Sequence, residues 1–118
     1  MAKSSTKFGS YITERGDVVW IDFMPQVGRE QAGRRPAIVI SGRGYNGKVG
    51  LALVCPITNK TKGYPMEIPI PEDLGVSGVI LADQVKSFDW NGRKAELMCK
   101  LPSELVDDVI AALTNLLN

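Results

Sequence analysis

The stretch GREQAGRRPAIVIS, residues 28–41, concentrates one glutamate and three arginines in a segment that runs through a proline into an apolar run. Glu30 offers a carboxylate that can accept a proton, and each arginine offers a planar, permanently charged fork that matches phosphate oxygens. Together they could take a proton from a hydroxyl and stabilise the negative charge that develops on a phosphate. These groups suit metal-free phosphodiester transfer to an internal 2′-hydroxyl, which requires RNA.

The composition removes most other kinds of catalysis. The chain contains no histidine, which excludes Ser-His-Asp and Cys-His nucleophilic systems and every histidine-containing metal site. The carboxylates of Asp22, Asp83 and Asp89 are scattered without the spacing of metal ligands. Two cysteines, Cys55 and Cys99, cannot form a structural zinc site on their own. We therefore expect no metal and no cofactor.

The segment GRGYNGK, residues 42–48, matches a phosphate-binding loop only superficially. Val49 stands where that loop needs Ser or Thr, and the segment is expected to lead into a strand rather than to open a helix. Asn and Gly both tolerate positive φ, so Asn46-Gly47 predicts a hairpin turn instead.

Length and composition indicate one globular domain. The chain has 118 residues, 44% of them apolar, and no apolar run long enough to span a membrane. The first residues are polar and lack the apolar core of a secretory signal, so we expect a cytoplasmic protein with reduced cysteines. We predict a flexible N-terminal arm at 1–14 and a single domain at 15–118.

Charge is unevenly distributed along the chain. Residues 1–71 carry ten Lys and Arg against five Asp and Glu, whereas residues 72–118 carry four against eight. A positive half favours a polyanionic partner, although ordinary scatter of surface charge explains the same imbalance.

The pattern of apolar and turn residues predicts short strands followed by one helix. Expected strands, from their β-branched and aromatic residues, cover 17–23, 37–41, 49–58, 66–71, 78–90 with a bend at Ala82-Asp83, and 94–100. The loop between the first two spans 24–35, and the prolines of 66–71 suit an edge strand. From Leu105 onward apolar residues recur at helical spacing, after start signals at Pro102 and Ser103. The sequence thus predicts a strongly bent antiparallel barrel of the α+β class with an amphipathic C-terminal helix.

Four blocks in this order, GDVVWIDF, GREQAGRRPAIVIS, PITNKTKGYP and GVILADQVKS, resemble the MazF/PemK toxins, endoribonucleases of bacterial toxin–antitoxin pairs. The resemblance runs from about Gly16 to Ser87, and the closing helix also stands in the expected place. It implies an SH3-like barrel, a homodimer and an acidic antitoxin partner. It further implies metal-independent, sequence-specific cleavage of single-stranded RNA that leaves a 2′,3′-cyclic phosphate and a 5′-hydroxyl.

The resemblance also implies roles for individual residues. Glu30 matches the family's loop glutamate, a candidate general base, while Arg35 and Thr58 match its catalytic arginine and threonine. Some members carry a histidine in the loop or before the Arg-Pro pair, where this chain has Arg34, and Leu81 replaces an arginine found in others. The candidates for RNA binding are Arg29, Arg34, Asn59, Lys60, Asp83, Gln84 and Lys86.

Structural roles compete with these assignments. Glu30 could form a buried ion pair with an arginine, Thr58 could cap a turn, and Asp83 could orient a loop. Trp20 and Trp90 suit a core or an interface. At the level of function, the alternatives are a non-enzymatic toxin resembling the gyrase-binding CcdB group and an SH3-like protein-binding module. The first lacks the tryptophan that the CcdB group carries near the chain end, and the second would favour more exposed aromatic residues.

Overall fold

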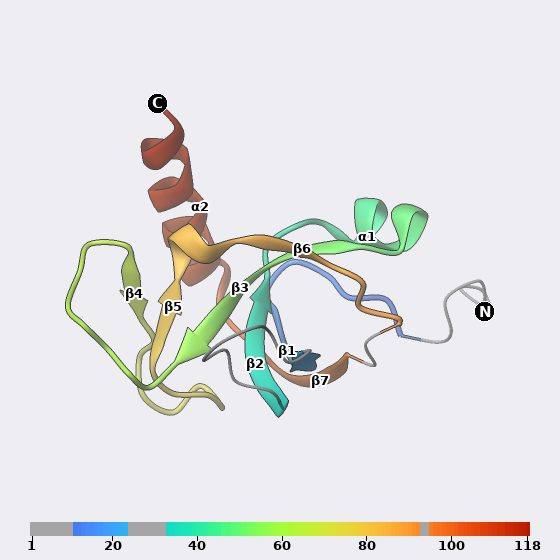
Figure 1. Ribbon diagram of the computed structural model, residues 1–118, viewed down its shortest axis with the longest axis horizontal. Coiled ribbons are helices and arrows are strands. Elements are labelled where there is room, and N and C mark those ends of the chain that lie inside the picture. Colours follow the sequence, from blue (N-terminus) through green and yellow to red (C-terminus); the bar gives the residue numbers. More distant parts are fainter. Residues whose placement is uncertain (1–10, 24–32, 93–94) are drawn as a thin grey trace.

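The computed structural model describes residues 11–23, 33–92 and 95–118, and its elements alternate short strands with three helical segments (Figure 1). In chain order they are β1 (Asp17–Phe23), β2 (Gly33–Val39), α1 (Arg43–Val49), β3 (Ala52–Thr58), β4 (Glu67–Pro69), β5 (Val79–Leu81), the 3₁₀ helix η1 (Ala82–Gln84), β6 (Lys86–Phe88), β7 (Glu96–Lys100) and α2 (Ser103–Leu117). The strands form one antiparallel sheet in the order β4-β5-β3-β2-β1-β7, and β6 pairs with β3. The predicted mainly-β fold and the edge position of β4 are confirmed.

β3 bends the sheet because it pairs with two strands on the same side. Its first half pairs with β6, as in Ala52 with Phe88, and its last residues pair with β5, as in Thr58 with Val79. η1 lies between β5 and β6, so the bend predicted at Ala82-Asp83 is a single turn of 3₁₀ helix. Figure 1 shows β5, η1 and β6 as one bent ribbon that follows β3.

The two faces of the sheet pack into two separate cores, as the two-residue period of a strand requires. One face packs against α2 through the buried residues Val18, Ile38, Ile40, Cys55, Ile57, Ile80, Leu105, Val106 and Val109. The other face packs around Val19, Ile21, Ala37, Val39, Ala52, Val54, Phe88 and Trp90. Trp90 is thus a core residue, which confirms one of the two roles expected for it.

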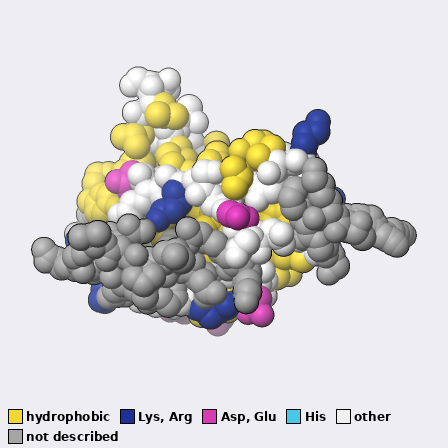
Figure 2. Space-filling model, turned by 45° about the vertical axis from the view of Figure 1, so that its right-hand side comes forward, with side chains coloured by type: hydrophobic (Ala, Val, Ile, Leu, Met, Phe, Trp, Pro, Cys, Tyr) yellow, Lys and Arg dark blue, Asp and Glu magenta, His cyan; other side chains and the backbone are white. Residues whose placement is uncertain are grey.

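α2 confirms the predicted C-terminal helix. It begins at Ser103 directly after Pro102, carries Glu104 in its first turn and buries one apolar stripe in the core. Its projecting end exposes hydrophobic side chains, with Leu117 81% exposed (Figure 2). In the part of the chain that the structure describes, no helix is long and apolar enough to cross a membrane.

The hairpin predicted at Asn46-Gly47 is wrong, because these residues lie inside α1. Asn46 is fully buried, and its side-chain amide donates to the carbonyl oxygens of Thr13 (2.8 Å) and Ser41 (3.2 Å). Its own carbonyl accepts a hydrogen bond from the indole of Trp90 at 3.3 Å. The left-handed conformation falls instead on Gly50, which ends the helix with φ 84°.

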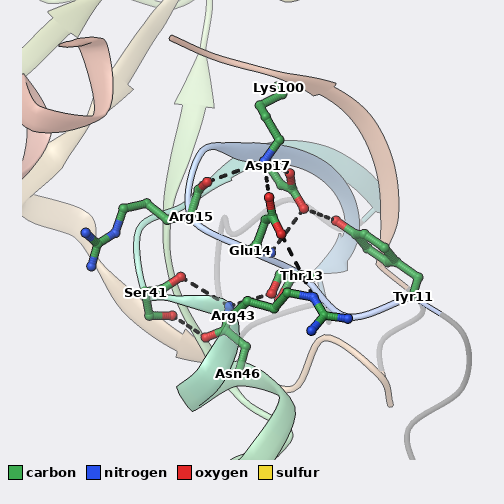
Figure 3. Close-up of polar contacts among 9 residues, drawn as sticks. All are labelled: Tyr11, Thr13, Glu14, Arg15, Asp17, Ser41, Arg43, Asn46 and Lys100. Atoms are coloured by element: carbon green, nitrogen blue, oxygen red, sulfur yellow. Dashed lines mark hydrogen bonds and ion pairs between the residues drawn. The ribbon is translucent and has the colours of Figure 1, made fainter. Parts of the chain in front are cut away.

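A buried carboxylate, Asp17, ties the start of the domain to β7 (Figure 3). It accepts hydrogen bonds from the Tyr11 hydroxyl (2.5 Å) and the Glu14 amide (3.1 Å), and its other oxygen lies 2.7 Å from the Lys100 ammonium. Burial and the bond to Asp17 raise the pKa of Tyr11, which keeps the hydroxyl a donor. Within the arm predicted at 1–14, residues 11–14 therefore contact the barrel, and residues 1–10 lie outside the described residues.

We expect Asp17→Ala to lower the free energy of unfolding by about 2–4 kcal/mol, because it leaves a hydroxyl, an amide and an ammonium without their shared acceptor. Asp17→Asn keeps an acceptor oxygen but loses the charge facing Lys100, so its loss should be smaller. Urea unfolding followed by circular dichroism measures both. Equal stability of Asp17→Ala and the wild type would contradict this role.

Candidate functional site

The two arginines of the RRP motif lie in β2, not in the predicted loop, because β2 begins at Gly33 rather than at residue 37. Neighbouring strand residues point to opposite faces of a sheet. Arg35 pairs with Ile21, on the face that packs around Ile21 and Ala37, whereas Arg34 belongs to the other face. The strand therefore separates two side chains that the sequence places together.

Arg34 already has a protein partner. Its guanidinium lies 2.5 Å from a carboxylate oxygen of Glu96, a residue of β7 on the far side of β1. The two side chains are 39% and 70% exposed, so this is a surface pair that contributes little to stability. The pair orients Arg34 toward β7.

Arg35 and Thr58 come together at the same edge of the sheet. The register of β2 and β3 pairs Ala37 with Pro56, and the same register continued by two residues sets Arg35 opposite Thr58. Opposed residues on antiparallel strands share one face and lie close enough to interact. Both residues are half-buried, which suits groups that must meet a ligand while packing fixes their position.

Lys86 lies on this same face, across β3 from the arginine. It pairs with Val54, which pairs in turn with Val39 of β2. Gln84 and Asp83 precede it in η1, and all three residues are exposed. One face of the sheet thus carries a guanidinium, a hydroxyl and an ammonium, a set that can bind phosphate oxygens.

Thr58 and Asp83 also hold the chain around them. The Thr58 hydroxyl oxygen accepts the amide of Lys60 at 3.1 Å, and Asp83 accepts the Tyr64 hydroxyl at 3.0 Å. Partial burial and this bond raise the pKa of Tyr64. The turn-capping and loop-orienting roles considered for Thr58 and Asp83 are therefore present, and they leave the Thr58 hydroxyl hydrogen available to a ligand.

Sequence reasoning missed Gly78, which sets the distance between the 58–59 backbone and β5. Its φ is +113°, and a Cβ atom there would lie 2.3 Å from the Thr58 carbonyl oxygen. Asn59, a further predicted site residue, accepts a hydrogen bond from the neighbouring Ser77 hydroxyl at 3.1 Å. A glycine directly before a predicted strand was the available signal, since it often marks a close approach of backbone.

The remaining candidates are quickly placed. Arg29 and Glu30 lie outside the described residues. Both cysteines are free, as predicted, and burial, with a smaller effect of Asp83, raises the pKa of the Cys55 thiol to about 12. Cys55 is therefore a neutral core residue. Among the described residues, no three His, Cys, Asp or Glu side chains gather into a group that could hold a metal ion.

The fold and site define a small, strongly curved β-protein with one C-terminal helix and a phosphate-binding set of side chains on one face of its sheet. The chain belongs to the PemK-like, MazF-like toxins of type II toxin–antitoxin systems, whose family model matches residues 14–117. The resemblance seen in the sequence is thereby confirmed, and the CcdB-like alternative is not favoured.

Individual relatives support this membership. The chain is 48% identical over 85 residues to the endoribonuclease toxin MazF of Escherichia coli strain K12, which covers 72% of this chain and 76% of the relative. Its structure is similar to crystal structures from Deinococcus radiodurans. For MazF the TM-score is 0.84 at 47% identity, covering 92% of this chain and 98% of the other. For a MazE-MazF structure the TM-score is 0.85 at 47% identity, covering 92% and 97%.

We predict that Gly78→Ala shifts Thr58 and destabilises the protein. Gly63 is the matched control, because it also has positive φ (+78°) but a Cβ there meets nothing within 4 Å. Gly63→Ala should cost about 1–2 kcal/mol for the left-handed backbone alone. Gly78→Ala should cost about 1–3 kcal/mol more, because its Cβ overlaps the Thr58 carbonyl.

Urea unfolding gives the two stabilities, and the amide chemical shifts of Thr58 and Asn59 report the displacement. Equal costs for the two variants would show that Gly78 does not set this approach.

Proposed function

We propose that this protein is a sequence-specific endoribonuclease that cleaves single-stranded RNA and acts as a growth-inhibiting toxin. The observation that carries the proposal is the placement of Arg35 and Thr58 at one edge of one face, with Lys86 on the same face. This set can bind a phosphodiester on two sides. Membership of a family whose relatives are named endoribonuclease toxins supports the same conclusion.

The proposed chemistry uses the RNA's own 2′-hydroxyl as nucleophile. Its oxygen attacks the adjacent phosphorus, the bond from phosphorus to the 5′ oxygen breaks, and the products are a 2′,3′-cyclic phosphate and a 5′-hydroxyl. Glu30 takes the proton of the 2′-hydroxyl, and the leaving oxygen gains a proton. Arg35 and Thr58 stabilise the charge on the phosphate oxygens. A tethered nucleophile makes the attack intramolecular, so no metal-bound water is needed.

The proposed RNA path runs along the face of Arg35, past the end of β3 and over η1. Asn59 and Lys60 follow Thr58 directly, and Gln84 and Lys86 lie along the neighbouring ribbon. Asp83 contributes by holding Tyr64, and Arg29 belongs to the same loop as Glu30. Arg34 lies on the opposite face of β2 and pairs with Glu96, so we assign it to the margin of the path.

We further propose three properties of the toxin in the cell. It acts in the cytoplasm, it forms a homodimer, and an acidic antitoxin neutralises it by covering the RNA path. A solved MazE-MazF structure of a similar chain supports a protein partner. The positive balance of residues 1–71 would attract an acidic segment.

Arg35→Ala should lower kcat/KM for RNA cleavage by about 100- to 1,000-fold, the loss typical of one donor to a developing oxyanion. Arg34→Ala is the matched control: it removes the same charge from the adjacent residue, and we expect a loss below about tenfold, as for a surface ion pair. Cleavage of a labelled RNA measures both, and circular dichroism checks folding. A folded Arg35→Ala variant with wild-type turnover would remove Arg35 from the site.

The nucleophile can be tested on the substrate. After the cut site has been mapped on a long RNA, the single ribose 5′ to the cut is replaced by deoxyribose in a short strand. We expect binding to change little, because phosphate contacts supply most of the affinity, and cleavage to vanish. The reactions contain excess EDTA, in which the all-ribose strand should still be cut. Cleavage of the substituted strand at the same place would identify water as the nucleophile.

A further inference from the structure

The loop of residues 59–66, NKTKGYPM, joins β3 to β4 and is called here the basic loop because it carries Lys60 and Lys62. It lies at the side of the molecule away from α1 (Figure 1). It starts directly after Thr58, so its two ammonium groups stand next in sequence to a proposed catalytic residue. Its conformation is held by a residue to which no role has yet been given, Glu67 of β4.

Glu67 binds the backbone of the basic loop with both carboxylate oxygens. Oε2 accepts the amide of Lys62 at 2.8 Å, and Oε1 accepts the amide of Gly63 at 2.9 Å. Hydrogen bonds to a carboxylate are stronger than those between neutral groups. Glu67 is itself fixed, because it pairs with Leu81 in the sheet and its amide donates to the Tyr64 carbonyl at 3.1 Å.

Two further bonds hold the ends of the loop. The Lys60 amide donates to the Thr58 hydroxyl oxygen, and the Tyr64 hydroxyl donates to Asp83. The loop is thus tied at its start to the proposed catalytic threonine, in its middle to Glu67 and at its end to η1. A loop fixed before binding loses less conformational entropy when it meets a ligand.

The lysine side chains are left to solvent by this arrangement. Lys60 and Lys62 are exposed, and within the described ranges neither has an ion pair with a carboxylate. Glu67, the acidic residue that binds the loop, is engaged by backbone amides rather than by an ammonium group. Both cations can therefore serve an anionic ligand that passes Thr58.

We propose that Glu67 is a positioning residue for the RNA substrate: it fixes the basic loop so that Lys60 and Lys62 contact phosphates next to the cleaved one. This inference rests on the proposed function. It adds Lys62 to the binding residues and assigns a favourable role to a negative charge beside a polyanion. The sign of the effect separates this role from simple electrostatics. A carboxylate near RNA repels it, so its removal would ordinarily strengthen binding, whereas loss of a positioning carboxylate weakens it.

The test measures the affinity of wild type and variants for a short RNA that carries deoxyribose at the mapped cut and so is not cleaved. Fluorescence anisotropy from 50 to 200 mM salt gives the dissociation constant and its salt dependence. Glu67→Ala should weaken binding about 5- to 30-fold, the factor that corresponds to ordering the backbone of one residue. Its salt dependence should also fall, although no cation has been removed. Glu72→Ala, which removes an exposed acidic residue nearby, should bind as tightly as the wild type or slightly more tightly.

The lysines provide the second measurement. Lys60→Gln with Lys62→Gln should lower the salt dependence by about 1.4, or roughly 0.7 for each phosphate contact on a single strand. Adding Glu67→Ala to this double variant should weaken binding little further, because the carboxylate acts through the two lysines. Cleavage of the all-ribose strand at saturating RNA should keep its kcat in Glu67→Ala, with the loss appearing in KM.

Each contrary result has a distinct meaning. A wild type that neither binds nor cuts RNA overturns the proposed function together with this inference. If the wild type binds RNA but Glu67→Ala behaves like Glu72→Ala, or if the triple variant loses affinity additively, the positioning role alone is overturned. Glu67→Gln keeps one acceptor oxygen and should bind with intermediate affinity, which serves as the test if the alanine variant does not fold. An unchanged salt dependence in the double lysine variant also overturns the inference.

Discussion

The two-residue period of β2 is the constraint on which the site depends. This strand lies in the middle of the sheet, between β1 and β3, and both of its faces are covered. Ile38 is buried in the core against α2, while Ala37 and Val39 are buried in the other core. A shift of the strand by one residue would expose both sets, so the register is fixed by burial. The alternation then continues to Arg34 and Arg35 and sends them to opposite faces.

β3 extends this constraint to the rest of the site. Because it pairs with β2 on one side and with both β5 and β6 on the other, one strand sets the positions of Arg35, Thr58 and Lys86 relative to one another. Functional groups on strands of a packed sheet are held more precisely than groups on loops. The turn at η1 lets the ribbon of β5 and β6 follow β3 through its bend.

Loops around the site are fixed by side chains that the sheet itself positions. Glu67 of β4 binds two amides of the basic loop, and Gly78 beside β5 allows the backbone after Thr58 to approach closely. At the start of the domain Asp17 of β1 plays a comparable part for residues 11–14. In each case a buried or paired strand residue satisfies backbone groups of a neighbouring segment, so the order of the sheet is passed to the loops.

The sequence by itself determined the features that depend on neighbours along the chain. β-branched runs placed most strands, helical spacing after Pro102 placed α2, the prolines of β4 marked an edge, and ordered motifs identified the family and the arginine and threonine of the site. Tertiary structure decided what depends on partners far away in sequence. Asn46 became part of a helix because Thr13 and Trp90 bind it, and Arg34 turned to Glu96 because β7 pairs beside β1. The local pattern at these residues permits either outcome, and the choice is made by hydrogen bonds that form only after distant strands have paired.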